Sequence, residues 1–212
     1  MKIRSIDELE AAIASDFSWR RKELSNLKNL GMTSRKSIQE ILFKSGVTLL
    51  YAHWEGFVKK ASIVFCEYIN YQGLRYEELT NNFHVCALIE EFQGQYPHKN
   101  FKSALLVINE SPRYLANKCK INTDNYIDTN SNLNSKILHE ITLKVGIDYS
   151  LYELKENFID ESFLGLRNAI SHGEFRRIDK KEFNEMFDEI TALIDTFKNQ
   201  ILNAAIQRSF LV

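Results

Sequence analysis

Apolar residues recur at helical spacing from the start of the chain. Ser5-Ile6-Asp7-Glu8 has the form of a capping box, in which a serine and a glutamate three residues later satisfy the first backbone N–H groups of a helix. The apolar face that follows consists of Leu9, Ile13, Phe17, Leu24 and Leu27. This spacing predicts a helix that extends to about Leu30, where Gly31 stops it.

A second and longer apolar pattern follows. Thr33 or Ser34 can cap its start, and the pattern ends near Gly73. Its apolar positions are Ile38, Ile41, Leu42, Leu49, Trp54, Phe57, Val58, Ala61, Phe65 and Tyr68. No proline interrupts the segment, so we expect one long helix, with Gly46 as a weak point at which it could bend.

The middle of the chain, residues 75–150, has mixed signals and is interpreted as an insertion. It holds both prolines and an Asn-rich stretch, residues 117–134, which we expect to be a mobile loop. The apolar run 104–108 fits either a short strand or a turn of helix, because periodicity cannot assign so brief a run. Residues 135–145 are predicted to form a helix that Gly146 closes.

Two further helices are predicted near the C-terminus. One runs from about Asp160 to His172, and Gly173 can take the left-handed conformation that ends a helix. The other begins after Asp179, in a second capping-box pattern. Its apolar stripe, expected to be core or dimer packing, is Phe183, Phe187, Ile190, Ile194, Phe197, Ile201 and Ala205. Together the patterns predict an all-α, up-and-down helical bundle with a variable middle insertion at about 75–150, in one domain over residues 1–212.

Composition narrows the class of protein. The 27 basic and 28 acidic residues give a net charge of -1, so any contact with RNA must rest on a local group of cations. Cys66, Cys86 and Cys119 are odd in number and widely spaced, which argues against a disulfide framework and against a zinc site. The N-terminus lacks the apolar run of a signal peptide, and no uncharged run reaches membrane-spanning length. We therefore expect a soluble cytoplasmic protein that does not bind membranes.

One segment carries residues suited to chemistry, Arg167-Asn168-Ala169-Ile170-Ser171-His172. Cleaving a phosphodiester without a metal needs a group that moves protons near neutral pH and a cation that stabilises the phosphorane oxygens, and histidine and arginine fill these roles. At roughly 100° per residue the arginine and histidine lie about 140° apart on a regular helix. Asn168 with His172, and Arg167 with Ser171, instead form one broad polar stripe.

This segment and a second one together resemble the HEPN superfamily, small helical-bundle domains of prokaryotic defence and toxin systems. Nuclease members carry an arginine, a spacer and a histidine, as residues 167–172 do with a spacer of four residues and an asparagine after the arginine. The second segment, Tyr51-Ala52-His53-Trp54-Glu55-Gly56-Phe57-Val58-Lys59-Lys60, resembles the signature of the MAE-type HEPN-like nucleases of bacterial toxin and defence systems.

The resemblance implies a metal-independent endoribonuclease, active as a homodimer in which motif helices from two subunits line one cleft. His172 would assist attack by the RNA 2′-hydroxyl, Arg167 would hold the phosphate and stabilise its transition state, and Asn168 would bind the phosphate or orient the ring. One departure is that Glu174 stands where some HEPN proteins paired with a nucleotidyltransferase have a tyrosine, so control by modification at that position is not expected.

Several residues support this site in the hypothesis. Glu55 either orients Arg167 or His172 from the second helix or forms a surface pair with Lys59, and Ser171 lies on the polar stripe. Arg176 and Arg177 are candidates for RNA binding, or else belong to a solvated charge run. The neighbours His53 and Trp54 are expected to anchor the core or a dimer contact, with a partner for the indole N–H.

No cofactor and no metal is expected. A glycine-rich phosphate loop is missing from the sequence, and His84, His98 and His139 share no helical spacing.

Other classes of function remain open beside the ribonuclease of toxin–antitoxin or phage-defence type, whose partners would be its RNA substrate and a cognate antitoxin or defence-system protein. The first alternative is a non-catalytic HEPN-like adaptor or antitoxin that binds a partner protein or RNA and uses the polar stripe only to dimerise. A weaker one is a nucleotide-binding helper to a transferase.

Overall fold

The computed structural model describes residues 2–91 and 101–212 and confirms the all-α class. The helices are α1 (Ile6–Thr33), α2 (Lys36–Tyr71), α3 (Asn81–Glu91), α4 (Phe101–Leu115), α5 (Thr123–Tyr126), α6 (Ser135–Val145), α7 (Ser150–Glu153), α8 (Leu166–Ser171) and α9 (Lys180–Ile206). A 3-10 turn, η1 (Tyr76–Glu78), and a π-helix, η2 (Phe158–Gly165), complete the described elements. The division into one domain with an insertion stays a prediction.

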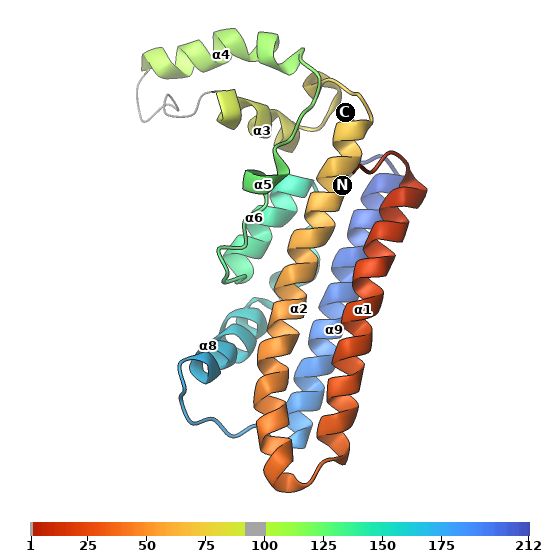
Figure 1. The fold of residues 1–212 in the computed structure, drawn as a ribbon. Coiled ribbons are helices and arrows are strands. Elements are labelled where there is room, and N and C mark those ends of the chain that lie inside the picture. The colour runs from red at the N-terminus through yellow and green to blue at the C-terminus, as the bar shows by residue number, and fades with distance from the viewer. Residues whose placement is uncertain (1, 92–100) are drawn as a thin grey trace.

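Three long helices, α1, α2 and α9, lie side by side and form the frame of the bundle (Figure 1). The predicted caps are present, because the Ser5 side chain accepts the N–H of Glu8 and the Asp179 side chain accepts those of Lys181 and Glu182. The second helix is continuous, as expected, and the turn that follows it contains Gly73 at φ 70°. It begins at Lys36 without a side-chain cap, slightly after the serine and threonine predicted to open it.

Two glycines of the long helices have a role that the sequence analysis did not assign. Gly31 was expected to stop the first helix, but α1 continues to Thr33. A Cβ at Gly31 would lie 2.9 Å from the ring of Phe43, and one at Gly46 would lie 2.6 Å from the ring of Phe183. Both glycines therefore allow a neighbouring aromatic ring to approach the helix, and Gly46 does not break α2.

The predicted insertion builds one end and one side of the molecule. Residues 104–108 lie within α4, which resolves the choice between strand and helix. In Figure 1, α3 and α4 form a hairpin that projects beyond the long helices. The Asn-rich stretch is not simply a loose loop, because it buries Cys119, Ile121, Ile127, Thr129 and Leu133.

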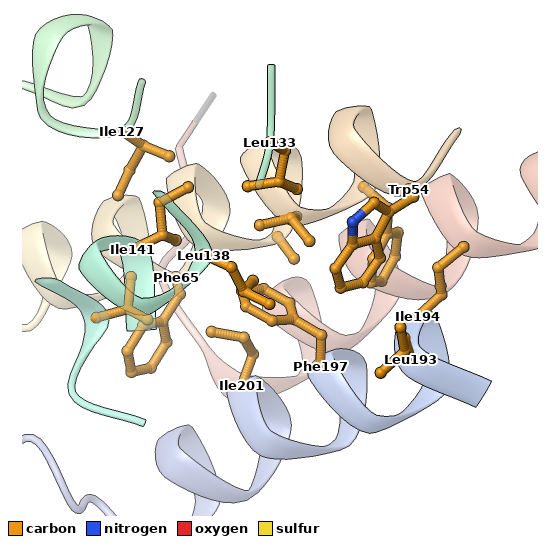
Figure 2. Close-up of a cluster of buried hydrophobic side chains, with 14 of the residues drawn as sticks. Trp54, Phe65, Ile127, Leu133, Leu138, Ile141, Leu193, Ile194, Phe197 and Ile201 are labelled. Carbon is orange, nitrogen blue, oxygen red and sulfur yellow. The ribbon is translucent and has the colours of Figure 1, made fainter. Parts of the chain in front are cut away.

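The buried core extends from the long helices into the insertion. Figure 2 shows Trp54 and Phe65 of α2, Leu138 and Ile141 of α6, Phe197 and Ile201 of α9, and Ile127 and Leu133 from the connecting segments in one cluster. The apolar stripe of the last helix is buried as core, as predicted. The insertion is thereby fixed against the helix that carries the second motif.

Among the residues that the structure describes, no helix combines the length and the apolar character that crossing a membrane requires.

Candidate functional site

The Arg167–His172 segment follows directly on a π-helix. Residues 160–165 were expected to be ordinary α-helix, but Phe158–Gly165 is π-helical and only Leu166–Ser171 is α-helical. Asp160 fixes this segment to the start of α6, because its carboxylate accepts hydrogen bonds from the backbone N–H and the hydroxyl of Ser135, each at 2.6 Å. Since π-helical turns are rare and are often found at functional sites, this segment marks the neighbourhood of α8 as unusual.

His172 stands at the C-terminal end of α8, as the following glycine predicted. Gly173 has φ 77° and donates its N–H to Ile170, and Glu174 donates its N–H to Ala169 at 2.9 Å. These two bonds are the Schellman arrangement that closes a helix. The imidazole of His172 is exposed, so it is accessible to a ligand.

Arg167 is half-buried at the other end of α8. Its Nη1 donates a 2.8 Å hydrogen bond to Oδ1 of Asn168, and its Cζ lies 4.4 Å from the centroid of the Tyr51 ring. The ring, which belongs to α2, is almost completely buried. An aromatic face attracts a cation electrostatically, so Tyr51 limits the positions that the guanidinium can take.

The insertion makes a polar contact with Glu55, which lies one helical turn after Tyr51 on α2. The hydroxyl of Thr129 donates to Oε1 of Glu55 at 2.5 Å. Burial and then the Glu55 carboxylate raise the pKa of the Tyr51 hydroxyl, whereas the Arg167 guanidinium lowers it. In the part of the chain that the structure describes, Glu55 forms no ion pair with Arg167, His172 or Lys59. The role of Glu55 in orienting Arg167 or His172 stays a hypothesis.

Tyr51 and Thr129 were given no role by the sequence analysis. Tyr51 had a usable signal, since it precedes Glu55 by one helical turn and the two must share a face of α2. Thr129 had none, because its contact with Glu55 joins residues 74 positions apart.

The remaining residues of the second motif face α1 instead. The Nδ1 of His53 lies 3.3 Å from Nη1 of Arg20, and its Nε2 lies 2.7 Å from Oε2 of Glu23. Burial, followed by the charge of Arg20, lowers the pKa of His53. A Cβ at Gly56 would lie 2.8 Å from the same guanidinium. Trp54 is buried as expected, but its indole N–H has no hydrogen-bond partner among the described residues.

The other candidate residues lie on the surface beside α8. Ser171 is exposed at the last position of that helix. Arg176 pairs with Glu174 at 2.9 Å and Arg177 with Glu40 at 3.7 Å, and both arginines are exposed. Exposed pairs of this kind are weak in water, so both guanidinium groups remain open to exchange for a phosphate.

Of the scattered histidines, His98 lies outside the described residues, and the buried Nε2 of His84 has no hydrogen-bond partner among those residues. The ring of His139 stacks on Tyr149 with centroids 4.2 Å apart. Within the described ranges, no group of three or more histidine, cysteine, aspartate or glutamate side chains is placed so that it could hold a metal ion.

Comparison with known proteins gives one family. A family model described as RiboL-PSP-HEPN matches residues 15–203, whereas no curated protein and no solved structure matches the chain. The match confirms the HEPN resemblance, although the model is not that of the MAE-type family whose signature residues 51–60 resemble. HEPN domains often act as dimers and bind RNA, so membership points to a nuclease-type or RNA-related function. The chain therefore belongs to the RiboL-PSP-HEPN family of helical domains.

Proposed function

We propose that this protein is a cytoplasmic, metal-independent endoribonuclease of toxin–antitoxin or phage-defence type that acts as a homodimer. The observation that carries the proposal is the arrangement along α8. The guanidinium of Arg167 is held on a buried aromatic ring at one end, and the imidazole of His172 is exposed at the other. The family membership makes RNA the substrate to test first.

The chemistry follows from the two side chains. The RNA 2′-hydroxyl gives its proton to His172 and attacks the adjacent phosphorus, while the bond from phosphorus to the 5′-oxygen breaks and that oxygen takes up a proton from water. The charge that develops on the phosphorane oxygens is stabilised by Arg167, and Asn168, already bound to the guanidinium, orients it. The products are a 2′,3′-cyclic phosphate and a 5′-hydroxyl.

A second copy of the chain completes this site in the proposal. Five positions along a helix separate the two side chains by about 140°, so one copy does not aim both at the same phosphate. A twofold axis would bring Arg167 of one copy to His172 of the other. Beside α8 runs an open groove of about 490 Å³ with an apolar lining that includes Ile41, Leu49 and Ile170, and Ile41 is 64% exposed. This surface is suited to contact with the second copy.

Within this proposal Tyr51 is a positioning residue. It touches Arg167 and leaves the phosphate to the guanidinium, while the Glu55 carboxylate, which accepts from Thr129, lies near enough to raise the pKa of the Tyr51 hydroxyl. A guanidinium that is already oriented loses less conformational freedom when it binds the transition state.

Cleavage of a labelled single-stranded RNA by the purified protein tests the function. His172→Ala and Arg167→Ala should each lower the rate at least about a hundredfold, and a chelator should leave the parent rate unchanged. If His172→Ala cleaves at the parent rate, the proposal is wrong.

Mixing the two inactive variants tests the shared cleft. A mixed dimer of Arg167→Ala and His172→Ala retains one intact pair across the twofold axis, so an equal mixture should recover up to about a quarter of the parent rate. A site contained within one copy would recover nothing.

The alternative of a non-catalytic adaptor or antitoxin is favoured by a different observation. The α3–α4 hairpin exposes apolar side chains on both helices, among them Val85 at 47%, Phe101 at 80% and Ile108 at 67%. Surfaces of this kind bind partner proteins. Expression in a host separates the functions, because a nuclease should be toxic alone and harmless as His172→Ala, whereas an adaptor should be tolerated in both forms.

A further inference from the structure

An exposed aromatic ring lies three residues beyond His172. Phe175 is 77% exposed in the irregular stretch between α8 and α9. The Nζ of Lys44, which belongs to α2, lies 5.0 Å from the centroid of its ring. The ring is therefore held by a cation from another element while most of its surface remains open to solvent.

The surroundings of this ring continue into the candidate site. Lys44 also lines the groove beside α8, together with Ala52 of α2 and Ile170 of α8. Arg176 follows Phe175 directly, and its guanidinium pairs with an exposed glutamate that a phosphate could replace. An aromatic face, an ammonium and a guanidinium thus occur together beside the end of α8.

This combination matches the chemistry of an unpaired nucleotide. Aromatic side chains stack on bases that have left a duplex, and nearby cations bind the backbone phosphates. In double-stranded RNA the base faces are covered by their neighbours, so such a ring has no partner there. Because the net charge of the chain is -1, binding to RNA must depend on local groups of cations such as this one.

We propose that Phe175 and Lys44 form a subsite that stacks one unpaired base of the RNA strand positioned at Arg167 and His172, with single-stranded RNA as the substrate class. This inference rests on the proposed ribonuclease function. It assigns the aromatic ring to the base and the ammonium to an adjacent phosphate.

Binding measured in the His172→Ala background tests the subsite without cleavage. A labelled single-stranded RNA is titrated and its fluorescence anisotropy recorded. Adding Phe175→Ala should weaken binding about 5- to 150-fold, the range for loss of one stacked base, and should leave the affinity for duplex RNA unchanged. Tyr71→Ala is the matched control, because Tyr71 is an exposed aromatic ring at the C-terminal end of α2 and should leave binding unchanged.

Two further variants separate the base from the phosphate. Phe175→Trp should retain the affinity for single-stranded RNA. RNA should also quench the tryptophan fluorescence of this variant more than that of the parent, whose own tryptophans are Trp19 and Trp54. Lys44→Gln should weaken binding to single strands of every sequence and reduce the salt dependence of binding by about one phosphate contact.

The possible results distinguish failure of the base-stacking subsite from failure of the proposed ribonuclease function. If Phe175→Ala binds single-stranded RNA like its background, or if duplex RNA binds as tightly and depends equally on the ring, the subsite is wrong while cleavage by His172 can still stand. If Phe175→Ala dissociates a dimer on size exclusion, the ring belongs to the contact between copies and the inference fails. If His172→Ala cleaves RNA at the parent rate, the proposed function itself fails.

Discussion

In the proposed ribonuclease, removing the aromatic face beneath Arg167 should lower activity while both proposed catalytic side chains, Arg167 and His172, remain. Tyr51→Leu leaves an apolar side chain of lower volume and eliminates the ring that lies 4.4 Å from the guanidinium carbon. Contacts of this kind contribute about 0.5–1 kcal/mol when exposed and about 2 kcal/mol or more when desolvated. Because Tyr51 is 1% exposed and Arg167 is half-buried, we take about 1–2 kcal/mol. The expected loss in kcat/KM is about 5- to 30-fold.

Three variants isolate this effect. Tyr51→Phe keeps the ring and removes only the hydroxyl, so its kcat/KM should stay within about threefold of the parent. Tyr68→Leu is the matched control for stability, because Tyr68 is 3% exposed on the same helix and contacts Phe210 edge-on instead of α8. Each leucine variant should lose about 1–3 kcal/mol of unfolding free energy from the smaller core side chain, so rates are compared where circular dichroism shows both folded.

A double-mutant cycle decides whether the ring acts through the guanidinium. In an Arg167→Ala background, Tyr51→Leu should have almost no further effect on kcat/KM, because the group that it positions is already gone. Equal losses in Tyr51→Leu and Tyr68→Leu, or full additivity of Tyr51→Leu with Arg167→Ala, would refute the positioning role.

Further predictions concern stability. Thr129→Val removes the donor to Glu55 and should lower the unfolding free energy in urea by about 1–2 kcal/mol; an unchanged midpoint would contradict the importance of that contact. His53 is buried with its pKa lowered, so it stabilises the fold while neutral, and unfolding free energy should fall as pH drops below about 6.5. His53→Gln should flatten that slope below about pH 6.5, and parallel slopes in the two proteins would count against the prediction. Gly46→Ala places a Cβ 2.6 Å from the Phe183 ring and should cost about 1–3 kcal/mol despite the better helix propensity of alanine, so a raised Tm would be the contrary result.

The elements that the sequence predicted well are those whose signals are local. A long amphipathic helix repeats its apolar pattern over many turns. Its ends are marked by capping residues, such as Ser5, Asp179 and Gly146. The C-terminal end of α8 belongs to the same class, because Gly173 supplies the positive φ that closes it. These signals were sufficient for the fold class and for the position of His172.

Features set by distant neighbours could not be read in this way. Gly31 looks like any helix-ending glycine, and only the Phe43 ring packed against it explains why α1 continues. The π-helix before Arg167 has no periodicity that distinguishes it from an α-helix in so short a segment. The contact between Thr129 and Glu55 depends on how the insertion folds back over α2.

The residues of the second motif, residues 51–60, lie on two faces of α2 with different contacts. The two sets of residues therefore indicate different things when the motif is found in a sequence. Tyr51 and Glu55 lie towards α8 and the insertion, whereas His53 and Gly56 accommodate Arg20 of α1. The contact with Arg20 joins α2 to α1 and takes no part in the proposed chemistry. In the proposed mechanism only the pair that faces α8 bears on the chemistry, because Tyr51 contacts the guanidinium of Arg167. A relative that kept the residues facing α1 but lost Arg167, His172 and the aromatic ring should therefore fold in the same way and cleave nothing.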